Sequence, residues 1–195
     1  RHQRHTWSSI FSSISLSPWK SISSASSATL TAASGSVTID MTSSNGKYTI
    51  VGGSGNNTLK AGQQDSTLRG MDGDDIIVGD AGADDLTGGV GSDTMTGNGG
   101  NDTFVALAGN TKIMDLNTGD VLVVSSGAEI STEPVLSFTA TSSTSNSGTA
   151  ELTVKSAGGS IDMSLSSSGG YTLVGGAGID TLVGSSGADT FRVVS

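Results

Sequence analysis

A nine-residue rhythm runs without a gap through the middle of the chain. From Gly52 the sequence reads GGSGNNTLK, AGQQDSTLR, GMDGDDIIV, GDAGADDLT, GGVGSDTMT and GNGGNDTFV. The eighth position of every unit is apolar, and from the third unit onward the fourth position is glycine and the sixth is aspartate. A short fixed period of this kind indicates a solenoid, in which each unit supplies a turn and a strand that stack on their neighbours.

If two units make one coil, residues eighteen apart lie above one another in a parallel sheet, at a spacing of about 4.7 to 4.9 Å. The eighth positions then form a thin core made of Leu59, Leu68, Ile77, Leu86, Met95 and Phe104. The sixth positions stack at the edges, Asp75 with Asp93 and Asp84 with Asp102. Carboxylates at such a spacing repel one another unless a cation lies between them.

Composition limits what else can hold this fold together. Glycine takes 29 positions, aromatic residues are 4% of the chain, and cysteine is absent, so disulfides are excluded. The formal charge of -9 argues against nucleic acid as a partner, because binding to its backbone needs lysine and arginine. No apolar run is long enough to span a bilayer, and the run at residues 121–124 is a strand at most.

Oxygen is the ligand that these turns can offer to a cation. Cysteine is missing and the two histidines are His2 and His5, which excludes a soft-metal site in the repeats. Flexible turns that supply carboxylate and carbonyl oxygens suit calcium better than magnesium, which demands a stricter octahedron. We therefore expect Ca²⁺ between the stacked turns.

A longer repetition lies above the nonapeptides. Residues 30–59 are echoed by residues 152–182, each through Ser/Thr-rich strands, an Ile-Asp-Met tripeptide and a Tyr-Thr-[Ile/Leu]-Val-Gly-Gly lead-in to a nonapeptide array. The second array has two units, GGAGIDTLV and GSSGADTFR. Alternating apolar and polar residues between the arrays predict half-buried strands, and helical periodicity is absent. The acids of the two tripeptides, Asp40 and Asp162, are expected at strand ends.

These patterns predict four parts for the chain. They are a Ser/Thr-rich strand segment over 1–51, a roll of six nonapeptides over 52–105, a closing strand with a second strand segment over 106–174, and a short second array over 175–195.

The units resemble the RTX, or hemolysin-type, calcium-binding repeat, whose consensus is G-G-x-G-x-D-x-U-x with a large apolar residue at U. The match is cleanest over residues 70–105 and 175–192. The resemblance implies an all-β fold, a parallel β-roll flanked by strand-rich segments, whose six-residue turns bind Ca²⁺ through the sixth-position aspartate and turn carbonyls. Carried over by position, the ligands are Asp75, Asp84, Asp93, Asp102, Asp180 and Asp189, the turn glycines Gly73, Gly82, Gly91 and Gly100, and Asn57.

The first two units depart from the consensus. Asn57 can still offer a carbonyl oxygen, but Ser66 is a poor ligand and Gln64 replaces the glycine at position four. Asp65 compensates only if the register shifts. We expect a weaker and partly metal-free start of the roll before Gly70.

Catalysis has no support in the sequence. The histidines lie within the first five residues, and neither an H-E-x-x-H nor a G-x-S-x-G motif occurs. Serine is abundant, but it is no nucleophile without a positioned base. We therefore expect a protein that is not an enzyme.

The N-terminal end has a different character from the acidic repeats. It carries Arg1, Arg4 and Lys20 before the first acid, which makes cell-surface polysaccharide a candidate partner. It lacks the continuous apolar segment of a secretory signal. A start at Arg1 indicates a processed product or a piece of a longer protein. Trp7 and Trp19 are expected to pack or to lie at an interface.

RTX repeats imply export by a type I system, with repeats unfolded in low-calcium cytosol and folded outside the cell. Together with the Ser/Thr/Gly-rich composition and the duplicated plan, this predicts a structural protein of the bacterial cell surface, such as a surface-layer or extracellular filament subunit that self-associates. An adhesin and the C-terminal secretion module of an exoenzyme or toxin are the alternatives.

Overall fold

The computed structural model describes residues 27–32, 34–155 and 157–194, and over these residues it consists of strands and turns without a helix. All strand pairings in this part of the chain are parallel. The prediction of an all-β fold is therefore confirmed. The strands are β1 (Ala28–Thr31), β2 (Thr38–Asp40), β3 (Tyr48–Ser54), β4 (Thr58–Lys60), β5 (Thr67–Asp72), β6 (Ile76–Val78), β7 (Asp85–Thr96), β8 (Thr103–Ala106), β9 (Ala108–Ile113), β10 (Val121–Val124), β11 (Ala128–Thr132), β12 (Ser137–Thr139), β13 (Ser145–Asn146), β14 (Thr149–Thr153), β15 (Ser160–Asp162), β16 (Thr172–Gly175), β17 (Thr181–Val183) and β18 (Thr190–Val193).

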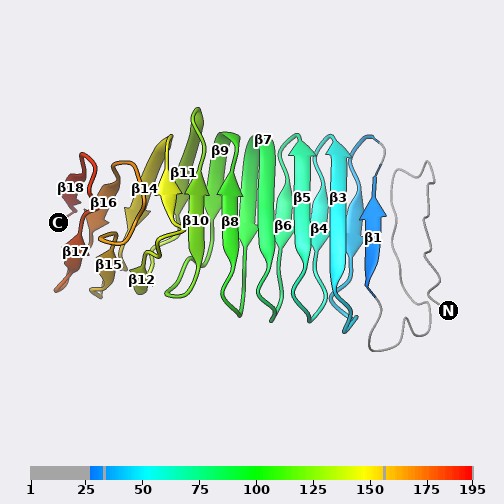
Figure 1. The fold of residues 1–195 in the computed structure, drawn as a ribbon, viewed down its shortest axis with the longest axis horizontal. Coiled ribbons are helices and arrows are strands. Elements are labelled where there is room, and N and C mark those ends of the chain that lie inside the picture. The colour runs from blue at the N-terminus through cyan, green and yellow to red at the C-terminus, as the bar shows by residue number, and fades with distance from the viewer. Residues whose placement is uncertain (1–26, 33, 156, 195) are drawn as a thin grey trace.

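The chain winds into a parallel β-solenoid. Figure 1 shows its strands side by side along the long axis in chain order, from blue at β1 to red at β18. A 15-stranded sheet follows the path β1-β3-β5-β7-β9-β11-β14-β16-β18 with the shorter strands beside it, and β12, β15 and β17 form a separate three-stranded sheet. Strand β7 is long because it runs through its turn, pairing first with β8 and then with β9.

The strand register follows the nonapeptide count. Leu68 pairs with Leu86, and Leu86 with Phe104, each eighteen residues on. Ile77 pairs with Met95 by the same step. This confirms that two nonapeptides make one coil.

The core is a double column of the eighth-position side chains. One column stacks Leu59, Ile77, Met95 and Ile113, the other Leu68, Leu86, Phe104 and Leu122, and each of these side chains is 0% exposed. Each coil of the six nonapeptides contributes only two large side chains, because a strand of three residues directs one side chain inward. Because this apolar core is thin, the turns contribute much of the stability that holds the coils together.

The segment after the sixth nonapeptide continues the stack. Strand β10 lies between β8 and β13 and pairs with both, so it does not end the roll. Farther on, stacked residues lie twenty-one apart, from Leu152 to Leu173, and then eighteen apart again, from Leu173 to Phe191. The flanking strand segments are therefore further coils of one solenoid, with extra residues in their loops.

The two copies of the long repetition fold alike. Tyr48 and Tyr171 are both buried, and their hydroxyls contact Ser44 and Ser166 respectively. The Ile-Asp-Met acids end strands β2 and β15, as predicted.

Two groups of predictions concern the N-terminal end and the membrane. The basic start, with His2, His5, Trp7 and Trp19, lies outside the described residues. In the part of the chain that the structure covers, no helix is long and apolar enough to cross a membrane.

Candidate metal centre

The six-residue turns lie along two edges of the roll. Because two nonapeptides make one coil, successive turns alternate between edges. The first edge carries the turns 52–57, 70–75 and 88–93, and the second edge carries the turns 61–66, 79–84 and 97–102.

Two features of the later turns favour glycine at the fourth position. Gly91 has a φ of 139°, which residues with a side chain rarely adopt, and a Cβ there would collide with the carbonyl oxygen of Gly73 in the preceding coil. A Cβ on Gly100 would collide in the same way with the carbonyl oxygen of Gly82. The four predicted turn glycines therefore stack in two close pairs.

The sixth-position side chains form two hydrogen-bonded ladders inside the turns. On the first edge, Asp75 Oδ1 accepts the N–H of Asn57 at 2.7 Å and Asp93 Oδ1 accepts the N–H of Asp75 at 3.0 Å. On the second edge, Asp84 Oδ1 accepts the N–H of Ser66 at 2.6 Å, and Asp102 Oδ1 accepts the N–H of Asp84 at 2.8 Å. The predicted stacking of these aspartates is confirmed, with a backbone amide linking each pair.

The second carboxylate oxygen of these aspartates has a different environment. Oδ2 of Asp75, Asp93 and Asp102 is buried and has no hydrogen-bond partner among the described residues. A Cβ added to Gly70 would collide with Asp75 Oδ2 and lie 2.6 Å from the carbonyl oxygen of Gly88, so two acceptor oxygens converge there. Buried acceptors facing each other are costly unless something positive lies between them.

The second edge shows one variation on this theme. A Cβ on Gly79 would lie 2.5 Å from Asp84 Oδ2 and 2.6 Å from the carbonyl oxygen of Gly97. Here, however, Oδ2 accepts the N–H of Asp80 at 2.9 Å. The carboxylate of this turn is better satisfied than those of its neighbours.

The electrostatics of the turns reflect this crowding. Burial raises the pKa of Asp93 to about 6 and that of Asp102 to about 7, with repulsion from neighbouring aspartates adding to both. Burial likewise raises the pKa of Asp75 and Asp84. The turns therefore disfavour their own negative charge unless a cation neutralises it.

The donor set is suited to a hard cation. No group of three or more acidic or histidine side chains that could hold an ion occurs among the described residues. A bound ion would therefore take one carboxylate from a turn and complete its shell with main-chain carbonyl oxygens. An all-oxygen shell from flexible turns fits Ca²⁺.

The short second array repeats the ladder geometry. Asp189 Oδ1 accepts the N–H of Tyr171 at 2.8 Å, and Asp180 Oδ1 accepts the N–H of Gly159 at 3.1 Å. A Cβ on Gly184 would collide with Asp189 Oδ2. Both aspartates are half-buried, so they lie in the predicted positions but are closer to solvent than those of the first array.

One ladder residue is missing from the sequence prediction. Asp120 is 0% exposed, and its Oδ1 and Oδ2 accept the N–H groups of Asp102 and Asn117, both at 2.9 Å. Burial raises its pKa too. Counting in nines beyond Val105 would have found it, because the next units, ALAGNTKIM and DLNTGDVLV, keep an apolar eighth position and place Asp120 at the sixth.

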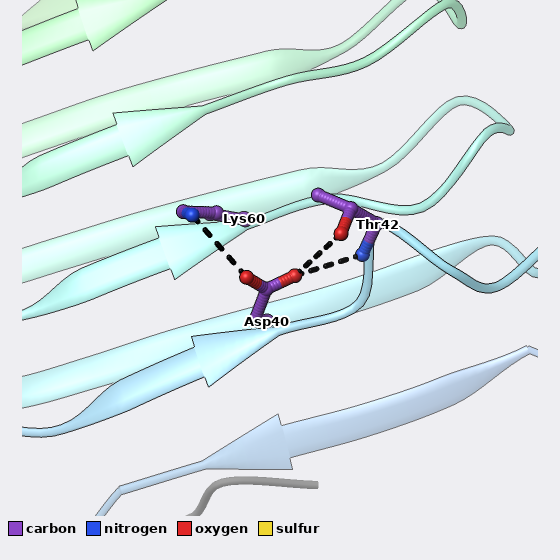
Figure 2. Close-up of polar contacts among 3 residues, drawn as sticks. All are labelled: Asp40, Thr42 and Lys60. Atoms are coloured by element: carbon purple, nitrogen blue, oxygen red, sulfur yellow. Dashed lines mark hydrogen bonds and ion pairs between the residues drawn. The ribbon is translucent and has the colours of Figure 1, made fainter. Parts of the chain in front are cut away.

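The acid of the first Ile-Asp-Met tripeptide has a purely local role. Figure 2 shows Asp40 Oδ1 accepting hydrogen bonds from the N–H of Thr42 at 3.1 Å and from its hydroxyl at 2.7 Å. Asp40 Oδ2 lies 3.2 Å from Lys60 Nζ. These hydrogen bonds lower the pKa of Asp40, which terminates its strand away from the ladders.

Comparisons with known proteins agree with this geometry. The family model of the RTX calcium-binding nonapeptide repeat matches in four copies, over residues 51–86, 78–113 and 172–192. No match to the chain was found among curated proteins or among solved structures. The matched residues include every carboxylate of both predicted arrays and the turns that hold them. The chain thus carries RTX calcium-binding nonapeptides, a repeat that is characteristic of proteins exported by type I secretion.

Proposed function

We propose that this chain is a calcium-dependent structural protein of the bacterial cell surface, a surface-layer or filament subunit whose roll folds when it meets calcium outside the cell. The observation that carries the proposal is the set of buried carboxylate oxygens without partners at Asp75, Asp93 and Asp102. They make the folded roll unfavourable without a cation.

The fold gives calcium a direct effect on stability. Each coil over residues 70–105 buries only two large side chains, whereas its turns bury carboxylates whose charge the fold itself does not neutralise. An ion bound only by the folded roll stabilises it, by about 2.7 kcal/mol when calcium is present at a hundred times its dissociation constant. With several such sites, the roll would be unfolded at low calcium and folded at high calcium.

The C-terminal coil supports self-association. It exposes apolar side chains, with Ile179 94%, Phe191 54% and Val193 80% exposed. A second copy of the chain would bury them, which is what a subunit of a lattice or filament requires.

Circular dichroism in the far ultraviolet tests the folding part of the proposal. We expect the strand signal of the full chain to fall when a chelator removes calcium and to return when calcium is added back in excess. Magnesium at the same concentration is the control and should restore little. A strand signal that the chelator leaves unchanged would contradict calcium-dependent folding.

Electron microscopy during a calcium titration tests the assembly part. Ordered sheets or filaments that appear with calcium would support a structural subunit. Persistent monomers at saturating calcium would contradict assembly and favour the adhesin or the secretion module.

A further inference from the structure

We propose that the first coil of the roll closes its turns without metal. The amide of Asn57 and the hydroxyl of Ser66 donate hydrogen bonds to turn carbonyl oxygens, and this coil is a calcium-independent template for the calcium-dependent coils after it. The inference rests on the proposed calcium-dependent folding and says where in the roll that dependence begins.

The side chain of Asn57 presents a donor where the later turns present an acceptor. Its Nδ2 lies 2.7 Å from the carbonyl oxygen of Gly55, 3.3 Å from that of Gly53 and 3.4 Å from that of Gly70. Those oxygens belong to the same turn and to the next turn on the same edge. The amide group therefore occupies the space that the later turns leave for a cation.

The orientation of this amide is set by its surroundings. Asn57 Oδ1 accepts the N–H of Val37 at 3.0 Å, which continues the first-edge ladder by one step. Exchanging the two ends of the amide would set the nitrogen against an N–H donor and the oxygen against three carbonyl oxygens. Asn57 thus faces the predicted metal position with its nitrogen and not with the oxygen that a ligand must offer.

Ser66 does the same on the second edge. Its Oγ donates to the carbonyl oxygen of Gln64 at 2.8 Å and accepts the N–H of Tyr48 at 3.2 Å. The hydroxyl both extends the ladder and satisfies the carbonyl at the fourth position of its own turn. Asn57 Nδ2 likewise donates to the carbonyl oxygen of Gly55, which is the fourth residue of its own turn.

The internal copy of the chain shows what these two residues replace. In the second array the positions of Asn57 and Ser66 hold Asp180 and Asp189. The N–H of Tyr171 donates to Asp189 Oδ1 as that of Tyr48 donates to Ser66 Oγ. The ladder is therefore preserved between the copies, and the difference is a neutral donor in place of a carboxylate.

This difference separates two classes of turn. In the turns of Asp75, Asp93 and Asp102 a buried carboxylate oxygen has no hydrogen-bond partner, so these turns need a cation to fold. In the turns of Asn57 and Ser66 the sixth-position side chain is neutral and its hydrogen bonds are made. The first coil can therefore persist in low calcium and offer strands β4 and β5 as edges for β6 and β7 of the next coil.

Hydrogen exchange on the wild-type chain tests the inference directly. In chelator, the amides of Val37 and Tyr48, which donate to Asn57 and Ser66, should exchange at least tenfold more slowly than those of Asp75 and Asp84, which donate to carboxylates. Added calcium should protect all four. Equal loss of protection at all four amides in chelator would overturn the inference while leaving calcium-dependent folding intact.

Counting bound calcium by native mass spectrometry gives a second, independent test. Asn57→Asp should gain one calcium ion per chain, and Asn57→Ala should lose none. The matched control is Asn56→Asp, which adds the same charge to the exposed neighbouring position and should gain no ion.

The outcomes separate the two proposals. A wild-type count reduced by one in Asn57→Ala would make Asn57 a ligand and overturn the metal-free coil. A wild-type chain that binds no calcium would remove both proposals. A gain of one ion in Asn57→Asp but not in Asn56→Asp supports the metal-free coil.

Discussion

The substitution Asp102→Asn should have opposite effects on stability with and without calcium. The new side chain has nearly the same shape, and its oxygen can keep accepting the N–H of Asp84, which lies 2.8 Å from Asp102 Oδ1. Its nitrogen would replace Oδ2, which is buried without a partner. Without calcium the variant loses a buried negative charge, whereas with calcium it loses the oxygen that we predict to be a calcium ligand.

The size of the gain follows from the pKa. Burial raises the pKa of Asp102 from 3.8 to about 7, with repulsion from Asp120 and Asp84 adding to the effect. At about 1.36 kcal/mol per pH unit, the fold disfavours the ionised carboxylate by about 4 kcal/mol above pH 7. Because part of this cost is shared with the neighbouring acids, we expect the variant to gain roughly 2 to 4 kcal/mol in metal-free buffer.

Urea denaturation at pH 8, followed by circular dichroism, measures both effects. In chelator the midpoint of Asp102→Asn should lie above that of the wild type, and the further increase caused by calcium should be smaller. Asp85→Asn is the control, because it removes the same charge from an exposed neighbouring residue and should change the chelator midpoint little. A lower midpoint for Asp102→Asn in chelator would refute the reasoning, since it would mean that the buried charge is already neutralised without metal.

Three further predictions follow from the same structure. Because the folded pKa of Asp102, about 7, lies above its ordinary value of 3.8, the folded metal-free chain holds more protons than the unfolded chain between these values. Its melting temperature in calcium-free buffer should therefore rise as the pH falls from 8 to 5 and level off below about 4, and a decrease would contradict the assignment. Gly97→Ala should abolish one calcium site, because its Cβ would collide with Asp102 Oδ2. The control in calcium titrations is Gly99→Ala in the same turn, where the added Cβ has no neighbour nearer than 3.9 Å. An equal loss of bound calcium in both variants would show that the effect is not local. Phe104→Ala should destabilise the calcium-loaded roll by about 3 to 5 kcal/mol, as for other buried aromatic residues. Phe191→Ala, at a side chain 54% exposed, should change stability by less than about 1 kcal/mol but weaken calcium-induced assembly in light scattering; the reverse order of stabilities would place the core elsewhere.

The sequence alone determined the period of this protein and what the period implies. An apolar residue at the eighth position of all six units, with an acid at the sixth position from the third unit onward, fits a fold in which residues eighteen apart stack. Leu86 beside Phe104 and Asp75 beside Asp93 could therefore be predicted without coordinates. The RTX repeat itself was recognisable from the same pattern.

The sequence predicted the fold less well where the residues depart from the nonapeptide consensus. Beyond Val105 the glycines become fewer, and the sequence predicts a closing strand where the structure has the coil that carries Asp120 and Leu122. The stack continues there because the parallel ladder and the inward side chain are enough to hold a coil, with or without a complete metal-binding turn.

Only the tertiary structure decided what each sixth-position side chain does. The residue type alone does not predict that one carboxylate oxygen of an aspartate accepts a main-chain N–H from the neighbouring coil. Nor does it predict that the other oxygen faces a main-chain carbonyl oxygen. Nor does it say that the amide of Asn57 turns its nitrogen to that carbonyl. Those choices depend on which groups eighteen residues away reach the same point, because a buried polar atom is settled by the partners that packing brings to it.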